Sequence, residues 1–469
     1  MTRYLPGLAA FGAAMLVALT GLYANADTPA EAPTPPAGTV ELRLLGVNDL
    51  HGHLEPPRPG VGGVAWLSSH LDRASVPERT IRVHAGDMVG ASPLLSSWFK
   101  DEPTIEAANR MGFDVGTVGN HEFDEGGDEL LRLLELSRFP YIAANTRLRD
   151  TGELLLPPYE IVERAGVRVG FIGVTTPSTP KWLLDRHAAR FRWTDISDEV
   201  NRQVAELRER GVEAIVVLAH AGGPTQDESD APDFVGEIVD EAREMSAAVD
   251  VVIAGHSHSR LDLRVPNRDG AGDKLVIEAL SYGVAYDLVD ITVDRRTGDV
   301  VAKSGRVAGT GHDTAAPDQA LAAFVEGYRA RLAPVADRVL GSADTPLTRE
   351  DGRLGRLVAE GERAFARADA AVASPVALRA DLDAGPIAYE ELARVLAYDH
   401  PVMRFRLSGR ELRALAAGSN YYAGPQELDP EATYTVAASE LLVPRGSPVG
   451  TEVEAVSWHL ARVRPPAGG

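Results

Sequence analysis

Five apolar stretches of this chain each end in residues of the types that bind metal ions. The residues that follow them are, in chain order, Asn48-Asp49-Leu50-His51, Gly86-Asp87, Gly119-Asn120-His121, His220 and Gly255-His256-Ser257-His258. Because the carboxyl ends of parallel strands meet at one edge of an open α/β sheet, side chains from all five can converge there. This recurrence constrains the fold more than any other feature. It predicts strands that alternate with helices and a site along one edge of the sheet.

The alternation begins at Val40 and predicts an α/β domain with helices packed outside the sheet. Helices are predicted at 128–137 and 198–210, the second with Val200, Val204 and Leu207 on one face. The predicted strands are residues 41–47, 80–85, 114–118, 141–144, 167–174, 214–219, 249–254, 275–279 and 288–293.

A longer helical pattern at 318–339 predicts an interdomain helix. After Gly341 the chain becomes a smaller unit rich in Ala and Arg, with predicted helices at 354–368 and 389–396 and strands at 403–407 and 433–437. We therefore expect a first domain at 39–316, a linker helix at 317–340 and a second, smaller α/β domain at 341–469.

The amino-acid composition excludes several kinds of site and of binding partner. The 469 residues include no cysteine, which excludes disulfides, thiolate ligands and a thiol nucleophile, so a metal site must use His, Asp, Glu or Asn. The net charge of −21 argues against a nucleic-acid polymer or an anionic membrane surface as the main partner. A small anionic substrate remains compatible, because a bound metal ion inverts the field locally.

The N-terminus predicts export. Arg3 precedes an apolar run from Leu5 to Tyr23, and Ala24-Asn25-Ala26 fits a small-x-small cleavage pattern, so residues 1–26 are predicted to be a signal peptide. An uncleaved membrane anchor is the alternative, because the run approaches spanning length. Residues 27–38 predict a disordered spacer. No second apolar span follows, so we expect a secreted, periplasmic or cell-surface protein.

The spacing of the candidate ligands suits two metal ions. The pairs Asp49-x-His51 and His256-x-His258 are two residues apart, so in extended chain both side chains of a pair point the same way. Asp87 has two oxygens and can bridge ions about 3.5–4 Å apart. Mixed Asp, Asn and His ligands suit Zn²⁺, Mn²⁺ or Co²⁺. A single motif of this kind is more often an ordinary turn or a core histidine, and only the recurrence at five strand ends predicts the metal centre.

The remaining histidines have no partner pattern and are assigned no role, with His84 a supporting residue at most. They are His53, His70, His84, His187, His312, His400 and His459.

At the ligand residues the chain resembles the 5′-nucleotidase family, in which a calcineurin-like metallophosphoesterase domain precedes a substrate-binding domain. The resemblance covers roughly residues 41–456 and implies an α-β-β-α sandwich followed by a smaller α/β domain, here shortened. It implies one metal ion on Asp49, His51, Asp87 and His258, and a second on Asp87, Asn120, His220 and His256. It also implies that His121 and Asp124 form the catalytic dyad, with Asn120 contacting the substrate.

The chemistry implied is hydrolysis without a covalent intermediate. Two divalent ions lower the pKa of a bound water, which attacks phosphorus in line. His121 neutralises charge on the equatorial oxygens, and Asp124, three residues further on, orients the imidazole.

The second domain resembles the family less closely. Arg349 and Arg379 match positions of phosphate-binding arginines, and Tyr398 matches one of two aromatic residues that sandwich the base. The family's Asn-Gly-Gly stretch is replaced by Ser374-Pro375-Val376-Ala377. Its late Gly-Gly-Asp-Gly loop, with the second aromatic residue, is absent. Tyr421 or Tyr422 is the alternative source of that ring.

These observations predict a secreted phosphohydrolase that releases phosphate from nucleoside 5′-monophosphates. An alternative is the same metal centre acting on cyclic nucleotides, UDP-sugars or other phosphate esters, which the missing aromatic loop favours. A third hypothesis is a non-catalytic binding protein that keeps its metal ions, although such a protein has no need of a His121–Asp124 pair. The expected partner in every case is a small molecule, and the oligomeric state stays open.

Overall fold

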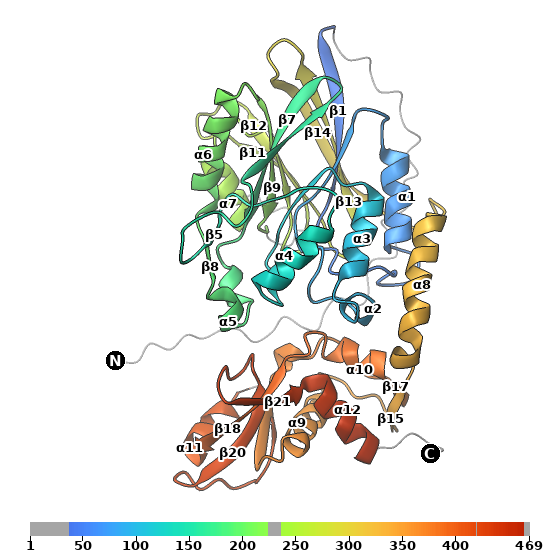
Figure 1. The fold of residues 1–469 in the computed structure, drawn as a ribbon, viewed down its shortest axis with the longest axis vertical. Helices are drawn as coiled ribbons and strands as arrows, with labels where there is room; N and C mark the ends of the chain where they lie inside the picture. Colours follow the sequence, from blue (N-terminus) through green and yellow to red (C-terminus); the bar gives the residue numbers. More distant parts are fainter. Residues whose placement is uncertain (1–36, 224–235, 419, 464–469) are drawn as a thin grey trace. The chain divides into compact units, whose positions relative to one another are not determined.

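The computed structural model describes residues 37–223, 236–418 and 420–463 (Figure 1). The predicted signal peptide and nearly all of the predicted spacer lie outside the described residues. Every helix within the described ranges is too short or too polar to cross a membrane.

The first of two large sheets has six strands in the order β14-β13-β1-β2-β3-β4. The four strands from β1 to β4 run parallel, and the hairpin of β13 and β14 closes one edge in the antiparallel sense. The bounds are β1 Thr39–Val47, β2 Thr80–His84, β3 Val115–Thr117, β4 Tyr141–Ile142, β13 Ala285–Asp294 and β14 Val300–Gly309.

The second sheet also has six strands, in the order β11-β12-β10-β9-β7-β6. Its four central strands are parallel, and an antiparallel strand lies at each edge. The bounds are β6 Tyr159–Arg164, β7 Val167–Thr175, β9 Ala214–His220, β10 Val251–Ala254, β11 Arg260–Pro266 and β12 Asp273–Ala279. A separate pair is formed by β5 Thr146–Leu148 and β8 Phe191–Trp193.

The two sheets pack face to face. One hydrophobic cluster joins residues of the first sheet, such as Leu44 and Val83, to residues of the second, such as Val216 and Ile253, all of them buried. Helices cover both outer faces (Figure 1). They are α1 Val64–Ala74, α3 Glu102–Met111, α4 Gly127–Leu136 and α8 Gln319–Ala336 on the first sheet, and α6 Ile196–Glu209 and α7 Glu237–Glu244 on the second. The predicted α-β-β-α sandwich is confirmed.

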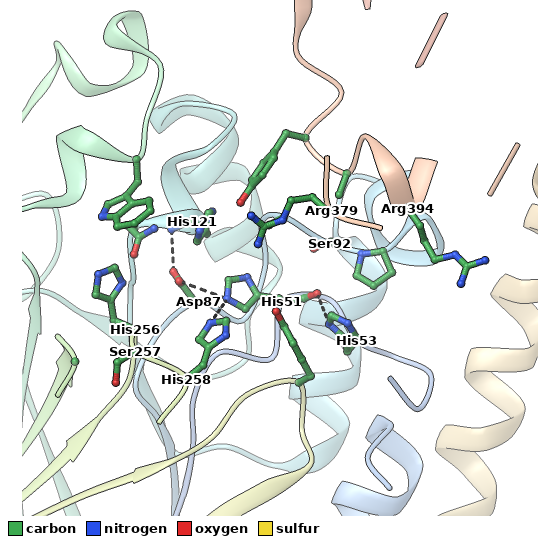
Figure 2. Close-up of a pocket in the computed structure, with 18 of the residues that line it drawn as sticks. His51, His53, Asp87, Ser92, His121, His256, Ser257, His258, Arg379 and Arg394 are labelled. Carbon is green, nitrogen blue, oxygen red and sulfur yellow. Dashed lines mark hydrogen bonds and ion pairs between the residues drawn. The ribbon is translucent and has the colours of Figure 1, made fainter. Parts of the chain in front are cut away.

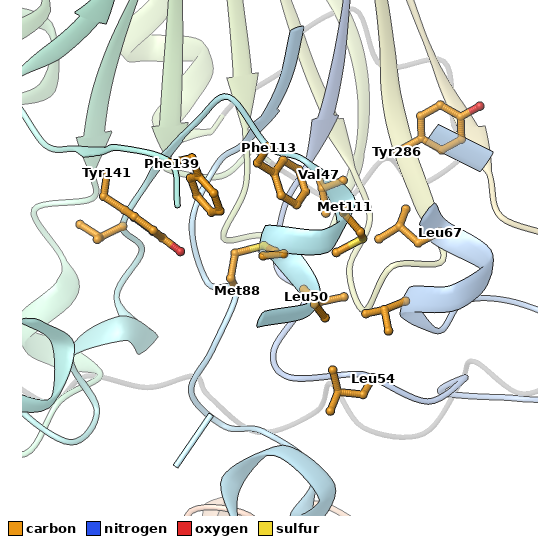
Figure 3. Close-up of a cluster of buried hydrophobic side chains, with 14 of the residues drawn as sticks. Val47, Leu50, Leu54, Leu67, Met88, Met111, Phe113, Phe139, Tyr141 and Tyr286 are labelled. Atoms are coloured by element: carbon orange, nitrogen blue, oxygen red, sulfur yellow. The ribbon is translucent and has the colours of Figure 1, made fainter. Parts of the chain in front are cut away.

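A buried cluster fixes the loops that leave the first sheet. Val47, at the end of β1, Leu50 and Met88 pack with Met111 and Phe113 beneath these loops (Figure 3). Leu50 and Met88 are each fully buried and lie next to predicted metal ligands in the sequence. The packing therefore anchors the backbone on either side of those ligands. Short helical segments complete this part of the chain: α2 Leu94–Ser97, η1 His121–Phe123, η2 Thr179–Lys181 and α5 Asp185–Ala188.

Every strand predicted for the first domain is present, but β5, β6, β8, β11 and β14 were not predicted. In β11 each buried residue is followed by an exposed one, so charged residues interrupt the apolar signal. The predicted helix at 318–339 ends at Ala336, because Val339 instead begins β15 and pairs with Ala388.

The second domain is a smaller α/β unit, as predicted. Its five-stranded sheet has the order β19-β16-β20-β18-β21, and β15 and β17 form a separate pair. The strands are β15 Val339–Ala343, β16 Ala370–Ala373, β17 Gly385–Ala388, β18 Pro401–Ser408, β19 Tyr421–Ala423, β20 Thr433–Ser439 and β21 Ser447–Thr451. The helices are α9 Arg353–Phe365, α10 Tyr389–Val395, α11 Gly409–Leu415 and α12 Glu452–Val463, with the short turn η3 Pro375–Ala377.

Two carboxylates are buried in this second domain, Glu362 on α9 and Glu452 at the start of α12. Both oxygens of Glu362 lack a hydrogen-bond partner among the described residues, whereas Glu452 accepts the His400 N–H at 3.2 Å. Burial and the neighbouring Asp399 raise the pKa of Glu452 from 4.5 to about 8. Burial and the charge of Glu452 raise the pKa of Glu362 well above its usual value. Both acids are therefore most compatible with the fold when they are protonated.

This pair predicts a stability that falls with rising pH. A carboxyl whose pKa is raised on folding contributes fully below its unfolded pKa, and the contribution is lost as pH rises through the folded value. For Glu452 this window runs from 4.5 to about 8, and for Glu362 it also begins at 4.5 and ends well above it. Glu362→Gln keeps the shape without a charge. We expect it to be more stable than wild type by about 2 kcal/mol at pH 9 and by less at pH 6, measured by thermal or urea unfolding. Glu163→Gln, on the exposed face of β6, is the control and should follow the wild-type curve. Parallel curves for Glu362→Gln and wild type would contradict the prediction.

Candidate metal centre and active site

The predicted metal ligands lie together at the carboxyl ends of β1, β2, β3, β9 and β10. Two groups of side chains each bring one ligand atom per residue to within 4.8 Å of the others. One group is Asp49, His51 and His258, and the other is Asp87, His220 and His256. Figure 2 shows His51, Asp87, His256 and His258 directed toward a common space. The strand ends thus converge as the sequence pattern predicts.

Asp87 lies between the two groups. Its Oδ2 is 3.0 Å from His220 Nε2 in one group and 3.7 Å from His51 Nε2 in the other. Asn120 joins the second group through its Oδ1, which is 3.1 Å from His220 Nε2. The buried Asn120 Nδ2 has no partner among the described residues. One aspartate is therefore in reach of both sets of ligands.

The hydrogen-bond partners of the histidine ring nitrogens indicate that the site fits cations. His220 Nδ1 lies 2.8 Å from the Ala85 carbonyl and His51 Nδ1 lies 2.9 Å from the Gly90 carbonyl. A carbonyl can only accept, so in the neutral rings Nδ1 carries the proton and Nε2 presents a lone pair. The lone pairs of His220 Nε2, Asp87 Oδ2 and Asn120 Oδ1 then face one another. Such a set of acceptors needs a positive charge among them. A divalent ion supplies it, and without one a proton on His220 does, because the Asp87 carboxylate outweighs burial and raises the pKa of that ring to about 10.

Most of these ligands have a backbone conformation that L-residues seldom adopt. The φ angles are 50° for Asp49, 46° for His51, 50° for Asp87, 78° for His256 and 55° for His258. Each such residue costs roughly 1–2 kcal/mol. Hydrogen bonds between loops hold the conformation, including Asp49 N to Gly86 O at 3.1 Å and His51 N to Asp87 O at 2.9 Å. This strain aims the side chains at one point.

Gly119 allows the backbone at the end of β3 to lie directly against the side chain of Asp87. A Cβ atom on Gly119 would lie 2.1 Å from Asp87 Oδ1, a distance that no side chain tolerates. The strand β3 can therefore deliver Asn120 beside Asp87 only because residue 119 has no side chain.

His121 and Asp124 form the predicted pair. His121 Nδ1 is 2.8 Å from Asp124 Oδ2, and His121 N donates to Asp87 Oδ1 at 2.8 Å. Burial lowers the pKa of His121, but the carboxylates of Asp124 and Asp87 outweigh it and raise the pKa to about 9. The ring lines the cavity beside the metal ligands. It can thus present positive charge to an anion bound there.

Two buried glutamates that the sequence did not single out support the ligand loops. Glu122 accepts the backbone N–H groups of Asp87 at 3.0 Å, Met88 at 2.8 Å and Gly119 at 2.5 Å. Burial and the charge of Asp87 raise the pKa of Glu122 to about 7. Glu278 accepts Ser257 Oγ at 2.8 Å and Ser259 N at 3.1 Å, which fixes the loop of His256 and His258. The available signal for Glu122 was its place in the stretch 119–124, between His121 and Asp124, but a sequence does not reveal that a carboxylate faces the backbone.

The ligands open into a cavity of about 800 Å³ that residues of the second domain also line. Arg379 and Tyr398 are both present, with the Arg379 guanidinium carbon 5.7 Å from the Tyr398 ring centre. The Tyr398 ring lies 6.2 Å from the ring of His121 at an angle of 19°. Figure 2 shows Arg379 directed toward His121 and Asp87, whereas Arg394 points away from them. The structure thus brings two of the three predicted substrate residues of this domain to the site.

Arg349 and the two alternative tyrosines lie elsewhere. Arg349 Nε is 3.0 Å from Asp381 Oδ1, Arg349 Nη1 donates to the Arg379 carbonyl at 3.1 Å, and Arg349 does not line the cavity. Tyr421 donates its hydroxyl to the Arg349 carbonyl, and Tyr422 donates to the Pro425 carbonyl. Neither tyrosine lines the cavity, so neither supplies the missing aromatic ring in this structure.

Comparison with known families matches both domains. Residues 42–260 match the calcineurin-like phosphoesterase family, and residues 335–421 match the 5′-nucleotidase C-terminal domain. The chain therefore belongs to the 5′-nucleotidase family of calcineurin-like phosphoesterases. Members of this family are metal-dependent hydrolases that act on phosphate esters.

Similar proteins carry different names. Endonuclease YhcR of Bacillus subtilis is 34% identical over 411 residues, which cover 81% of this chain and 33% of the relative. Cell wall protein Lmo0130 of Listeria monocytogenes is 30% identical over 405 residues, which cover 74% of this chain and 51% of the relative. The chain thus spans only a third to a half of the length of these relatives. The crystal structure of a 5′-nucleotidase precursor from Thermus thermophilus shares the fold, with 24% identity, a TM-score of 0.73 and coverage of 91% and 97% of the two chains.

The role of Glu122 can be tested by its amide. Glu122→Gln keeps the volume but replaces one acceptor oxygen by a donor, so it cannot hold all three backbone N–H groups that position Asp87 and Gly119. We expect metal affinity to fall about 10- to 100-fold, measured by titration of the apoprotein with Zn²⁺ or Mn²⁺. Glu125→Gln, at an exposed neighbouring acid, should bind metal like wild type. Equal affinity of the two variants would show that Glu122 does not position the ligands.

Proposed function

We propose that the chain hydrolyses phosphate esters with two divalent metal ions and that its substrates are nucleoside 5′-monophosphates. The observation that carries the proposal is the sharing of Asp87 by two ligand groups, beside His121–Asp124 and Arg379 in one cavity. Asp49, His51, Asp87 and His258 would hold one ion, and Asp87, Asn120, His220 and His256 the other.

The side chains of the protein would stabilise charge on the phosphoryl group and hold the reacting groups in place. When bound, the two ions would supply Lewis acidity toward the phosphoryl oxygens and lower the pKa of an attacking water. Asp124 accepts the Nδ1 proton of His121 and so keeps that ring in place, with Nε2 left to bind a phosphoryl oxygen. Charge that develops on this oxygen in the transition state would be neutralised by the imidazolium, with the Asn120 amide as a further donor.

Substrate binding in this proposal uses the second domain. Arg379 would grip the phosphate through its guanidinium, while Tyr398 would pack against the remainder of the nucleotide. Arg349 would act indirectly, because it holds the Arg379 carbonyl and Asp381. We propose the domain limits 39–316 and 341–469, with a linker helix at 317–340 between them.

The residues also indicate which metal ions the site would hold and in which compartment the protein would act. The nitrogen and oxygen ligands suit Zn²⁺, Mn²⁺ or Co²⁺. We propose an exported protein, on the basis of the leader pattern at 1–26 and of the relative named as a cell wall protein.

A second candidate function keeps the metal centre and changes the ester. The absence of Tyr421 and Tyr422 from the cavity removes the expected second base contact from the second domain. This favours cyclic nucleotides, UDP-sugars or other esters as substrates, and a substrate panel decides between the two. A non-catalytic binding protein is less consistent with the site, because a purely structural metal centre needs no His121–Asp124 pair.

Phosphate release from AMP by metal-loaded protein tests the function. We expect turnover with Mn²⁺ or Zn²⁺, no turnover in EDTA, and loss of both metal and activity in Asp87→Ala. His121→Ala should retain its metal ions and lose about 100-fold or more in kcat. If no phosphate ester is turned over by the loaded protein, the proposal is wrong. If His121→Ala keeps full activity, the role given to that residue is wrong.

The role of Arg379 has a matched control in Arg394. Both arginines line the cavity, but only Arg379 is directed toward the metal ligands (Figure 2). Arg379→Ala removes a charged hydrogen bond to the phosphate, so KM should rise about 10- to 100-fold while metal content stays the same. Arg394→Ala should leave KM near the wild-type value, and a larger effect in this variant would place the phosphate elsewhere.

A further inference from the structure

Three aromatic residues line the cavity in the described part of the chain besides the histidines: Trp182, Tyr282 and Tyr398. Two of them already stack on other rings. Tyr282 lies 4.1 Å from the ring of His53, and Tyr398 lies parallel to His400 at 5.4 Å, with an angle of 2°. Tyr398 also faces His121 and the Arg379 guanidinium. Each tyrosine therefore contacts at least two other rings.

Trp182 differs in its exposure. Its side chain is 56% exposed, although it lines the cavity beside a predicted metal ligand. Its contact with the His256 ring is edge-on, at 5.8 Å and 81°. An indole has the largest flat apolar surface of any side chain, and this one lines the cavity with much of its surface uncovered, so it is available to a flat ligand bound there.

The backbone beneath Trp182 is well anchored, so its exposure does not come from a loose loop. Trp182 ends the short turn η2, and its N–H donates to the Thr179 carbonyl at 3.0 Å. Thr179 Oγ1 in turn donates to the Thr176 carbonyl at 2.7 Å. Thr176 Oγ1 donates to Glu237 on α7 at 2.8 Å, and the next residue, Leu183, is buried. A platform fixed in this way loses little entropy when a flat group stacks on it.

We propose that Trp182 forms an aromatic subsite for the leaving group on the phosphoesterase domain. The ligand class is a planar heteroaromatic ring, such as the base of a nucleotide, stacked on the indole while its phosphate faces the metal ligands. This rests on the proposed function for the phosphate. It also accounts for the loss of the aromatic loop from the second domain, because the ring contact would come from the other domain.

The test compares Trp182→Ala and Trp182→Leu with Trp182→Phe, each at verified metal content and thermal stability. For AMP we expect kcat/KM of the Ala and Leu variants to fall about tenfold or more through KM, whereas Phe retains most of it. For glycerol 3-phosphate, which has no ring, all variants should match wild type. In metal-free protein, where no turnover occurs, adenosine should quench wild-type tryptophan fluorescence and bind the Ala variant less tightly.

The outcomes separate the subsite from the proposed function. Equal losses for AMP and glycerol 3-phosphate, or loss of metal ions, would mean that Trp182 only supports His256 and would overturn the subsite. Unchanged AMP kinetics and unchanged adenosine binding would overturn it as well. If no ester is hydrolysed by wild type, the proposed function fails, and the adenosine titration still decides whether Trp182 binds a ring.

Discussion

The structure depends on the placement of one buried aspartate among nitrogen and oxygen lone pairs. Asp87 is 1% exposed, and its carboxylate faces His220 and His51 while it accepts the His121 N–H. Burying such a group without compensation costs several kcal/mol. Burial lowers the pKa of His220, but the Asp87 carboxylate outweighs it and raises the pKa to about 10, so either a proton on this ring or a bound cation can offset the cost. In both states the fold must hold these side chains at fixed positions, and much of the sandwich serves that requirement.

Three features meet the requirement. The parallel strands β1, β2, β3, β9 and β10 end side by side, and they rest on a core shared by the two sheets. Glu122 and Glu278 accept backbone N–H groups of the loops that carry the metal ligands, and these hydrogen bonds restrict the motion of the loops. The left-handed backbone at most of the ligands adds strain that only such a tightly held frame can sustain. Precise positioning here is a property of the whole domain.

The sequence predicted that the candidate ligands converge, because its signal is periodic and local. Strands buried on both faces give continuous apolar runs, and ligand residues directly after them need no knowledge of distant contacts. It failed where tertiary contacts decide. Glu122 and Glu278 look like ordinary acids, and Arg349 matches a family position but pairs with Asp381. Trp182 follows a proline-containing turn without any pattern, and only the fold reveals that it borders His256.

The metal ligands and the residues at the mouth of the cavity differ in how easily they can be exchanged. The reaction centre is built from strand ends, where a one-residue shift would break the core, so its chemistry is hard to alter. The rim is built from η2, α10 and the loop of Arg379, where exchange of a side chain disturbs little packing. If the chain acts as proposed, its substrate choice should lie in the exposed side chains around the cavity, since those are the ones that can change without loss of the metal ligands.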